Sequence, residues 1–470
     1  MRAVWGMAFL VLASAACSQQ GQPAPDAGLP DAGPDAGAPD GGPPDAGPDA
    51  GPPDAGPPDA GPPDAGPPDA GPPDAGPPDA GSPDAGWSGA WEPLGPLLGH
   101  EAQVYPEMAL DGSGAPLIAH VVLVESPGVV TTELHVVRWT GSAWSPLGGA
   151  VASTSDRMPY TAPLFLRLTT DGTGRPVLAF GDSGPGSTVG AFPLQTWAFD
   201  GSSWQVLPLP VSAQQLSGVA LSTGSDGQVR LVLATSHELR VLLLGASGWT
   251  EMLPPLVLDA GVSEPDLALA SDGSPLVAFS EAASPGSFGS LRALRGSDAG
   301  WSDLGLPSPP GENLLFHTPR IHARPDGGVV VAASEWQYDE ISKLQVGIAV
   351  PVFTLVDGGW SLLEQDGVPG GFALSEPIPG SPVDLQLASD VPVVVSTGAD
   401  GGVSLRALVA PNAEVAAPVL GGLGAGTLLL MRDGTPLVGA VLPVSDETGP
   451  EGADGGQVQI LHFTRTPPSH

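Results

Sequence analysis

Several residue types are scarce in this chain of 470 residues. Cys17 is the single cysteine, Lys343 is the single lysine, and there are three tyrosines. One cysteine excludes an internal disulfide, so the stability of any folded part must come from its core. Scarce and scattered basic residues, 15 against 51 acidic ones, make nucleic acid an unsuitable partner, because phosphate binding needs clustered Lys and Arg.

The first residues have the layout of an export signal. Arg2 precedes an apolar run that ends in the small residues Ala13–Ala16, and Cys17 follows directly. We predict a signal peptide over residues 1–16. The leader resembles that of bacterial lipoproteins, and this resemblance implies lipidation of Cys17, a membrane anchor, and a place in the cell envelope at the outer membrane or cell surface. Ordinary cleavage near Ala15 or Ala16, which gives a secreted protein, is the alternative.

Residues 17–86 are predicted to be a disordered tether. Six uninterrupted copies of Pro-Pro-Asp-Ala-Gly run from Pro52 to Gly81, and 13 Asp residues lie between Asp26 and Asp84. Such a segment has no apolar periodicity, its carboxylates repel one another, and proline favours an extended chain. We therefore expect a semi-flexible spacer in front of a folded domain over residues 87–470.

Two motifs alternate along that domain. An Asp-Gly turn followed by an apolar strand, or a related copy of it, recurs seven times, at Asp111, Asp171, Asp226, Asp272, Asp326, Asp390 and Asp433. The copies at Asp226 and Asp390 are poor matches. A turn followed by Trp and a short strand recurs at Trp91, Trp144, Trp204, Trp249, Trp301 and Trp360. Four short strands in roughly fifty residues correspond to one blade of a β-propeller. The expected fold is all-β, a seven-bladed propeller, with six or eight blades as alternatives.

The order of the motifs predicts how the ring closes. The domain opens with the isolated Trp91 segment, a fourth strand without its first three, and ends after Val458–Phe463, a third strand without its fourth. Pairing of these N- and C-terminal strands completes one blade and removes exposed sheet edges. The tryptophans are interpreted as packing between blades and the Asp-Gly carboxylates as turn formers. A degenerate fourth strand is expected near Val415–Val419.

The predicted binding face follows from loop length. The Asp-Gly and Trp turns are short and share one face, so the longer connections lie on the other face, where binding sites are commonly built. The segment Glu335–Glu340 is the richest of these loops, and Trp336, Tyr338 and Asp339 with Glu335 are candidate ligand-binding residues. Asp182 and Glu281 are a candidate carboxylate pair for acid–base chemistry near the channel.

No signature of a metalloprotease, serine hydrolase, phosphate loop or dinucleotide site occurs in the sequence. His317 and His322 are a weak metal-ligand pair. The turns at Ser297–Trp301 and Asp357–Trp360 faintly resemble the Asp boxes of sialidases, but their spacing to Trp is too short, so no catalytic residue is transferred from that family.

The resulting hypothesis is a monomeric, lipid-anchored propeller that binds a glycan or protein partner on its long-loop face without catalysis, cofactor or metal. It resembles bacterial lipoproteins that carry a propeller behind a tether. A secreted polysaccharide hydrolase or lyase is the competing class, and a structural envelope protein is the third.

Overall fold

The computed structural model describes residues 89–465, except 103–105, 127–128, 156–163, 182–192, 211–215, 283–288, 307–313, 340–343, 364–371, 374–382, 389, 398–402, 409–424 and 444–455. The predicted signal peptide, Cys17 and the tether lie outside these residues, as does Asp182. In the described part every regular element is a strand, and none of it forms a helix with the length and apolar character needed to cross a membrane.

The strands group into seven sheets within the described residues, numbered here along the chain. Sheet 1 contains β3 (Glu107–Leu110), β4 (Pro116–Ser126), β5 (Val129–Trp139) and β6 (Trp144–Pro146), with β7 (Ala152–Ser155) paired to β5. Sheet 2 contains β8 (Leu164–Thr170), β9 (Pro176–Gly181), β10 (Leu194–Phe199) and β11 (Trp204–Val206). Sheet 3 contains β12 (Leu216–Thr223), β13 (Val229–Thr235), β14 (Glu238–Gly245) and β15 (Gly248–Glu251), with β16 (Leu256–Val257) paired to β14.

Sheet 4 contains β17 (Gly261–Leu269), β18 (Pro275–Ala282), β19 (Gly289–Ser297) and β20 (Gly300–Asp303). Sheet 5 contains β21 (Leu314–Ala323), β22 (Val329–Asp339), β24 (Val352–Val356) and β25 (Gly359–Leu362), extended by β23 (Leu344–Val350) and β26 (Phe372–Ala373). Sheet 6 contains β27 (Asp384–Ala388), β28 (Val391–Thr397) and β29 (Val403–Ala407). Sheet 7 contains β30 (Ala425–Leu430), β31 (Pro436–Pro443), β32 (Gly456–Arg465) and β1 (Gly89–Pro93), with β2 (Leu98–Ala102) paired to β32.

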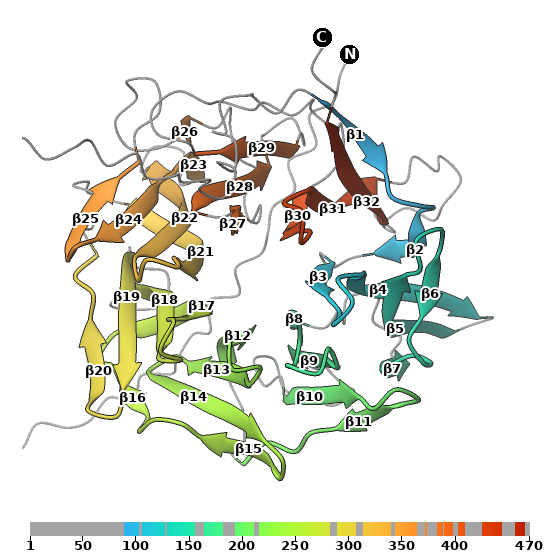
Figure 1. Cartoon of the computed structure of the whole chain (residues 1–470), viewed down its shortest axis with the longest axis horizontal. Helices are drawn as coiled ribbons and strands as arrows, with labels where there is room; N and C mark the ends of the chain where they lie inside the picture. The colour runs from blue at the N-terminus through green and yellow to red at the C-terminus, as the bar shows by residue number, and fades with distance from the viewer. Residues whose placement is uncertain are drawn as a thin grey trace, which may run out of the picture. The chain divides into compact units, whose positions relative to one another are not determined.

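These antiparallel sheets surround a common axis as a β-propeller (Figure 1). The innermost strands are β3, β8, β12, β17, β21, β27 and β30, and each contacts the next until β30 meets β3. Among the described residues six sheets have four strands or more and sheet 6 has three. The structure therefore shows six complete blades rather than the seven predicted, because the expected fourth strand of sheet 6, near Val415–Val419, lies outside the described residues.

The predicted closure of the ring is confirmed. Strand β1 pairs antiparallel with β32, and Trp91 lies opposite Phe463 in the register. Their rings meet edge to face with centroids 5.4 Å apart. Since β32 also pairs with β31, one sheet is built from both ends of the described chain. Strand pairing here removes the free edges that would otherwise flank an open ring.

Apolar clusters lie between neighbouring sheets rather than within one sheet. Residues of sheets 1 and 2 share one cluster, which includes Leu117 and Phe180, and residues of sheets 3 and 4 share another around Phe279. The remaining clusters join the other neighbouring pairs, so the apolar contacts run around the ring from sheet 1 through sheet 7 and back. Because strands bury both faces in this arrangement, they are apolar along most of their length.

The repeated tryptophans pack between blades, as predicted. In five of the six, the indole N–H donates a hydrogen bond to the preceding sheet. Four donate to a carbonyl: Trp144 to Leu94 (3.0 Å), Trp204 to Leu147 (2.8 Å), Trp301 to Pro254 (3.3 Å) and Trp360 to Leu304 (2.7 Å). Trp249 reaches the equivalent Leu207 carbonyl through the Thr196 hydroxyl. A large aromatic with a satisfied N–H is well suited to such a partly buried joint.

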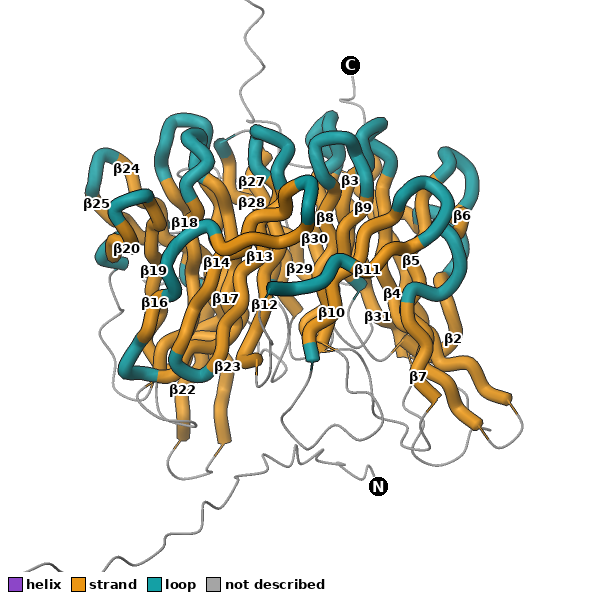
Figure 2. Tube along the Cα trace, turned by 90° about the horizontal axis from the view of Figure 1, so that it is seen from below, coloured by secondary structure: helices purple, strands orange, loops and turns teal. Residues whose placement is uncertain are grey.

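The Asp-Gly turns form two structural classes. In the first class, Asp111 and Asp171 are the first residues of their turns, and Gly114 and Gly174 close them with positive φ. In the second class Asp is the third residue, and the adjacent glycine, Gly227, Gly273, Gly327 or Gly434, has the positive φ. The same dipeptide therefore occupies two registers. The short turns gather along one rim of the ring (Figure 2).

Candidate functional site

A cavity of about 620 Å³ lies on the propeller axis and extends to the rim that carries the Asp-Gly turns. It is lined by residues of the innermost strands of several sheets. One position recurs in each of these strands, four residues before the first residue of the turn. It is occupied in order by Glu107, Arg167, Ala220, Asp266, Arg320, Asp384 and Thr427, which we call the inner ring, and all but Ala220 line the cavity.

The inner ring is held by ion pairs and main-chain contacts between sheets. Arg167 Nη1 donates to Glu107 Oε1 at 2.9 Å, and Arg320 Nε donates to Asp384 Oδ1 at 3.2 Å. Asp266 Oδ2 accepts the Ile321 N–H of the next sheet at 2.8 Å. These paired side chains are largely buried, and charge pairs in such a place are stronger than on an open surface.

Two further contacts continue this pattern around the axis. Asp384 Oδ2 accepts the Leu428 N–H at 2.8 Å, in the same way that Asp266 accepts from sheet 5. Thr427 Oγ1 donates to the Pro106 carbonyl at 2.7 Å and so links sheet 7 to sheet 1. The three carboxylates of the inner ring therefore each have at least one hydrogen-bond donor. These contacts link each sheet to the next from sheet 4 through sheets 5, 6, 7 and 1 to sheet 2.

Among the carboxyl groups that line the cavity, Glu107 has the pKa that departs most from its ordinary value. Burial raises its pKa to about 7, although the Arg167 guanidinium acts in the opposite direction. Its side chain is 17% exposed, so it still reaches the cavity. A glutamic acid that exchanges its proton near neutral pH can act as a general acid or base if a substrate reaches it.

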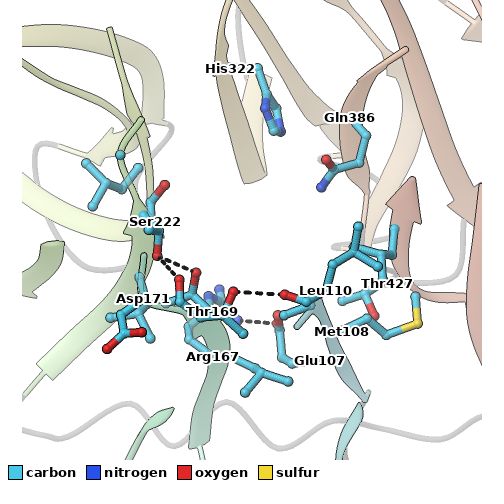
Figure 3. Close-up of a pocket in the computed structure, with 18 of the residues that line it drawn as sticks. Glu107, Met108, Leu110, Arg167, Thr169, Asp171, Ser222, His322, Gln386 and Thr427 are labelled. Atoms are coloured by element: carbon cyan, nitrogen blue, oxygen red, sulfur yellow. Dashed lines mark hydrogen bonds and ion pairs between the residues drawn. The ribbon is translucent and has the colours of Figure 1, made fainter. Parts of the chain in front are cut away.

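Above the inner ring lies a layer of neutral polar side chains, two residues further along the same strands. Thr169, Ser222, His322 and Gln386 occupy this layer and line the cavity. Figure 3 shows His322 and Gln386 on the far side of the open space from Ser222. Thr169 is hydrogen-bonded to Thr223 at 2.9 Å. Both His322 and Gln386 line the cavity, and neither has a hydrogen bond to another described residue.

Of the residues proposed from sequence, Glu281 and Glu335 are described with their side chains, and neither lines this cavity. Glu281 is on β18 and accepts from Arg292 at 2.7 Å, and it is not among the residues that line the cavity. Glu335 is 8% exposed, and burial raises its pKa. Residues 335–339 continue strand β22, whereas a loop was expected. The side chains of Trp336, Tyr338 and Asp339 are outside the described part, and so is Asp182. Binding by these residues stays a prediction.

The two histidines singled out in the sequence are separated by the strand geometry. His317 lies near Glu264, at 3.6 Å between Nδ1 and Oε1, whereas His322 faces the cavity. Within the described residues no group of three or more His, Cys, Asp or Glu is arranged to hold a metal ion.

The inner ring was missed by the sequence interpretation, although it leaves a signal. A charged residue stands four positions before the first residue of the turn in five copies, at Glu107, Arg167, Asp266, Arg320 and Asp384. Alignment of the copies on Asp-Gly hides this pattern, because the dipeptide stands in two registers. Alignment on the glycine with positive φ brings four of these charges, Glu107, Arg167, Asp266 and Arg320, to one position, whereas Val391 stands at the place of that glycine after Asp384.

Comparisons with known proteins show likeness in fold. No protein-family model and no curated protein matches the chain. A protein of unknown function from Dyadobacter fermentans is 15% identical, with a TM-score of 0.44, over 80% of this chain and 100% of that one. An ulvan lyase from a new family of polysaccharide lyases is 11% identical, with a TM-score of 0.47, over 80% and 94%.

A third solved structure is the SapL1 lectin in complex with α-methyl fucoside, 12% identical with a TM-score of 0.41, over 68% of this chain and 97% of that one. At these identities and scores the likenesses assign no activity. The assignment of a β-propeller rests on the sheets and on the cyclic contacts of their innermost strands.

Proposed function

We propose that the chain is a binding protein of the cell envelope whose propeller takes up a glycan at the axial cavity without chemistry of its own. The observation that carries this proposal is the neutral polar layer around the mouth of the cavity. Hydroxyl, imidazole and amide groups at Ser222, His322 and Gln386 offer both donors and acceptors, which match the hydroxyl groups of a sugar.

The inner ring supports binding over catalysis. Each of its three carboxylates accepts from an arginine or from a main-chain N–H of a neighbouring sheet. Removal of such a partner leaves a buried charge or an unsatisfied donor, so these groups are needed to hold the sheets together. The ring thus forms a rigid floor below the polar layer.

A glycan array with the full chain tests this proposal. We expect binding of the wild-type protein to one or more glycans, and loss of that binding in the variants His322→Ala and Gln386→Ala. His462→Ala is the matched control, since His462 lies on β32 beside Glu92 and is not among the residues that line the cavity. Equal binding by all three variants would place the glycan elsewhere.

A second candidate function, cleavage of a polysaccharide, is favoured by one observation, the pKa of about 7 for Glu107 beside Arg167 in the cavity. In that case Glu107, rather than Asp182 or Glu281, would exchange the proton. Incubation of a bound glycan with wild type and with Glu107→Gln separates the candidates. New reducing ends or unsaturated products from wild type alone would establish catalysis, and intact glycan would support binding.

The anchor and the blade number belong to the same proposal. The sequence Ser14-Ala-Ala-Cys17 supports lipidation of Cys17, and the tether would then hold the propeller away from the membrane. Cys17→Ala should move the protein from the membrane fraction to the medium, and unchanged fractionation would exclude the lipid. The cyclic contacts of the seven innermost strands support seven blades, with a fourth strand of sheet 6 contributed by residues near Val415–Val419.

A further inference from the structure

A second cavity, of about 360 Å³, opens between sheets 1 and 2. Arg138 of sheet 1 and Arg175 of sheet 2 line it together with an apolar surface that includes Leu147, Pro176 and Phe199. Both arginine side chains are 41% exposed. We call this site the Arg138–Arg175 groove. Its size is within the range of sites that hold one or two sugar rings.

Each arginine uses only part of its hydrogen-bonding capacity inside the protein. Arg138 donates from Nε to Asp111 Oδ2 at 2.5 Å and from Nη2 to Ser113 Oγ at 3.0 Å. Arg175 donates from Nε to Asp171 Oδ2 at 2.8 Å. Among the described residues no acceptor faces Arg138 Nη1 or either Nη of Arg175. Guanidinium groups bind oxyanions through such paired N–H donors.

The acidic side chains near the groove are already occupied. Asp111 Oδ1 accepts from Ser113 N, Ser113 Oγ and Ala115 N. Burial acts to raise the pKa of Asp111, but hydrogen bonds from Ser113 and Ala115, with Arg138, outweigh it and lower the pKa. Asp200 accepts from the main-chain N–H groups of Ser202 and Ser203, which lower its pKa. These acids remain ionised and offer few free lone pairs.

Main-chain N–H groups around the groove are also already hydrogen-bonded within the protein. The amide groups that border it, at Ser113, Ala115, Thr173, Arg175, Ser202 and Ser203, all donate to aspartate side chains. An extended peptide needs free main-chain partners to dock, and the turns offer none of these donors. A ring with apolar C–H faces and one anionic group fits the apolar surface and the two guanidinium groups.

We propose that the Arg138–Arg175 groove binds a sugar that carries an oxyanion, either a carboxylate or a sulfate. The sugar ring lies against Phe199, Pro176 and Leu147, and its anionic group accepts from the free N–H donors of both arginines. This site is additional to the glycan site proposed on the axis, although Asp111 and Gly174 line both cavities. One anionic polysaccharide could therefore occupy the two sites at once.

Calorimetric titration of the full chain tests the groove with three probes: a uronic-acid disaccharide, a sulfated disaccharide and an uncharged disaccharide. We expect binding of one or both anionic probes and none of the uncharged one. Arg138→Lys and Arg175→Lys keep a cation beside each aspartate but remove the paired donors, so each should weaken anionic binding by about tenfold or more. Thermal melting verifies that the variants are folded.

Arg295→Lys is the matched control. Arg295 occupies on β19 the register position of Arg138 on β5, opposite the serine that follows the blade tryptophan, and pairs with Asp272, but it does not line the groove. The Arg295→Lys variant should bind the anionic disaccharides with the same affinity as wild type. His322→Ala should also leave this binding intact, which separates the groove from the axial site.

A readout on the wild-type protein avoids any effect of substitution on folding. An arginine-directed dicarbonyl reagent, followed by mass spectrometry, should modify Arg138 and Arg175 more slowly when the anionic disaccharide is present, and Arg295 at an unchanged rate. Equal binding of the uncharged disaccharide, unchanged affinity in both lysine variants, or absence of protection would overturn the proposal.

Discussion

The first two Asp-Gly turns and the later ones share a dipeptide but differ in what it does. Asp111 and Asp171 stand at the start of their turns, and each accepts two main-chain N–H groups and an arginine. Asp272 and Asp326, as third residues, each accept one main-chain N–H. Sequence identity between repeats therefore does not imply equivalent contacts.

Individual turns also differ in how closely they approach a neighbour, and close approach is not confined to one class, since a Cβ on Gly227 would lie 2.7 Å from Gly172 Cα. A Cβ on Gly174 would lie 2.5 Å from Gly112 N and 2.6 Å from Gly112 Cα, whereas a Cβ on Gly434 would meet nothing within 4 Å. Sheets 1 and 2 are thus joined main chain to main chain at this rim. The same junction carries the Arg138–Arg175 groove, so a rigid frame supports the groove.

Substitution of these glycines should give the largest difference. Both have positive φ, so alanine strains either turn by about 1 kcal/mol. Gly174→Ala also forces the main chains apart and should lower the free energy of unfolding by about 3 kcal/mol in total. Urea denaturation of Gly174→Ala and Gly434→Ala measures both values, and equal losses would contradict the close approach of the turns.

Removal of the aspartates should have the second largest effect. Asp171→Ala leaves two main-chain donors and Arg175 without their acceptor, and we expect a loss of about 2 kcal/mol. Asp326→Ala loses one main-chain bond and an exposed pair with Arg324, with a loss of about 0.5 kcal/mol. The same denaturation experiment ranks them. A reversed ranking would mean that the two registers are energetically alike.

The pH dependence of stability should distinguish the buried groups Glu107 and His120 from the aspartates of the turns. Burial raises the pKa of Glu107 to about 7, so its contribution to stability grows as pH falls from 7 to 4.5. Burial, with His135 nearby, lowers the pKa of His120 to about 4, so its contribution is lost as pH falls from 6.5 to 4. The two effects oppose each other over nearly the same range.

Glu107→Gln should therefore reveal the effect of His120 on the pH dependence of stability. In that variant the free energy of unfolding should decrease on acidification from pH 6.5 to 4, by up to roughly 3 kcal/mol, while wild type changes less. Asp111 and Asp171 take no part, because their lowered pKa values place the loss of their contribution below pH 3.8. Denaturation at several pH values checks this, and parallel curves for the two proteins would refute it.

The smallest effect is expected where a later turn reaches the first. Arg432 Nη2 donates to the Gly112 carbonyl at 2.7 Å from an exposed position. Arg432→Met should keep the free energy of unfolding within about 0.5 kcal/mol of wild type. A larger loss in the same urea experiment would show that the turns of sheets 7 and 1 are coupled as strongly as those of sheets 1 and 2.

The sequence predicted the parts of the fold that depend on repetition. Ring closure through Trp91 and Phe463 and the inter-blade role of the tryptophans follow from motif order and are confirmed. The number of complete blades was wrong by one for the described residues, since the expected fourth strand near Val415–Val419 lies outside them.

The candidate sites could not be predicted in the same way. The inner ring unites Glu107, Arg167, Asp266, Arg320 and Asp384, which are about 60 residues apart or more in several cases and gather only because the ring closes. Arg138 and Arg175 converge through the packing of sheet 1 on sheet 2, which no local pattern encodes. In the sequence, a charged residue in a short strand also looks the same whether its side chain forms an ion pair or binds a ligand.

The pairing of β1 with β32 affects how the molecule can be made. A chain that leaves the ribosome, or threads through any pore, with its N-terminus in front presents Trp91 early, yet the partner of Trp91 is Phe463. Until that last segment follows, β1 has an unsatisfied edge, and sheets 1 and 7 expose the apolar surface that they later share. Assembly of the ring is therefore complete only after the segment up to Arg465 has emerged, and a holding chaperone would protect it during that interval.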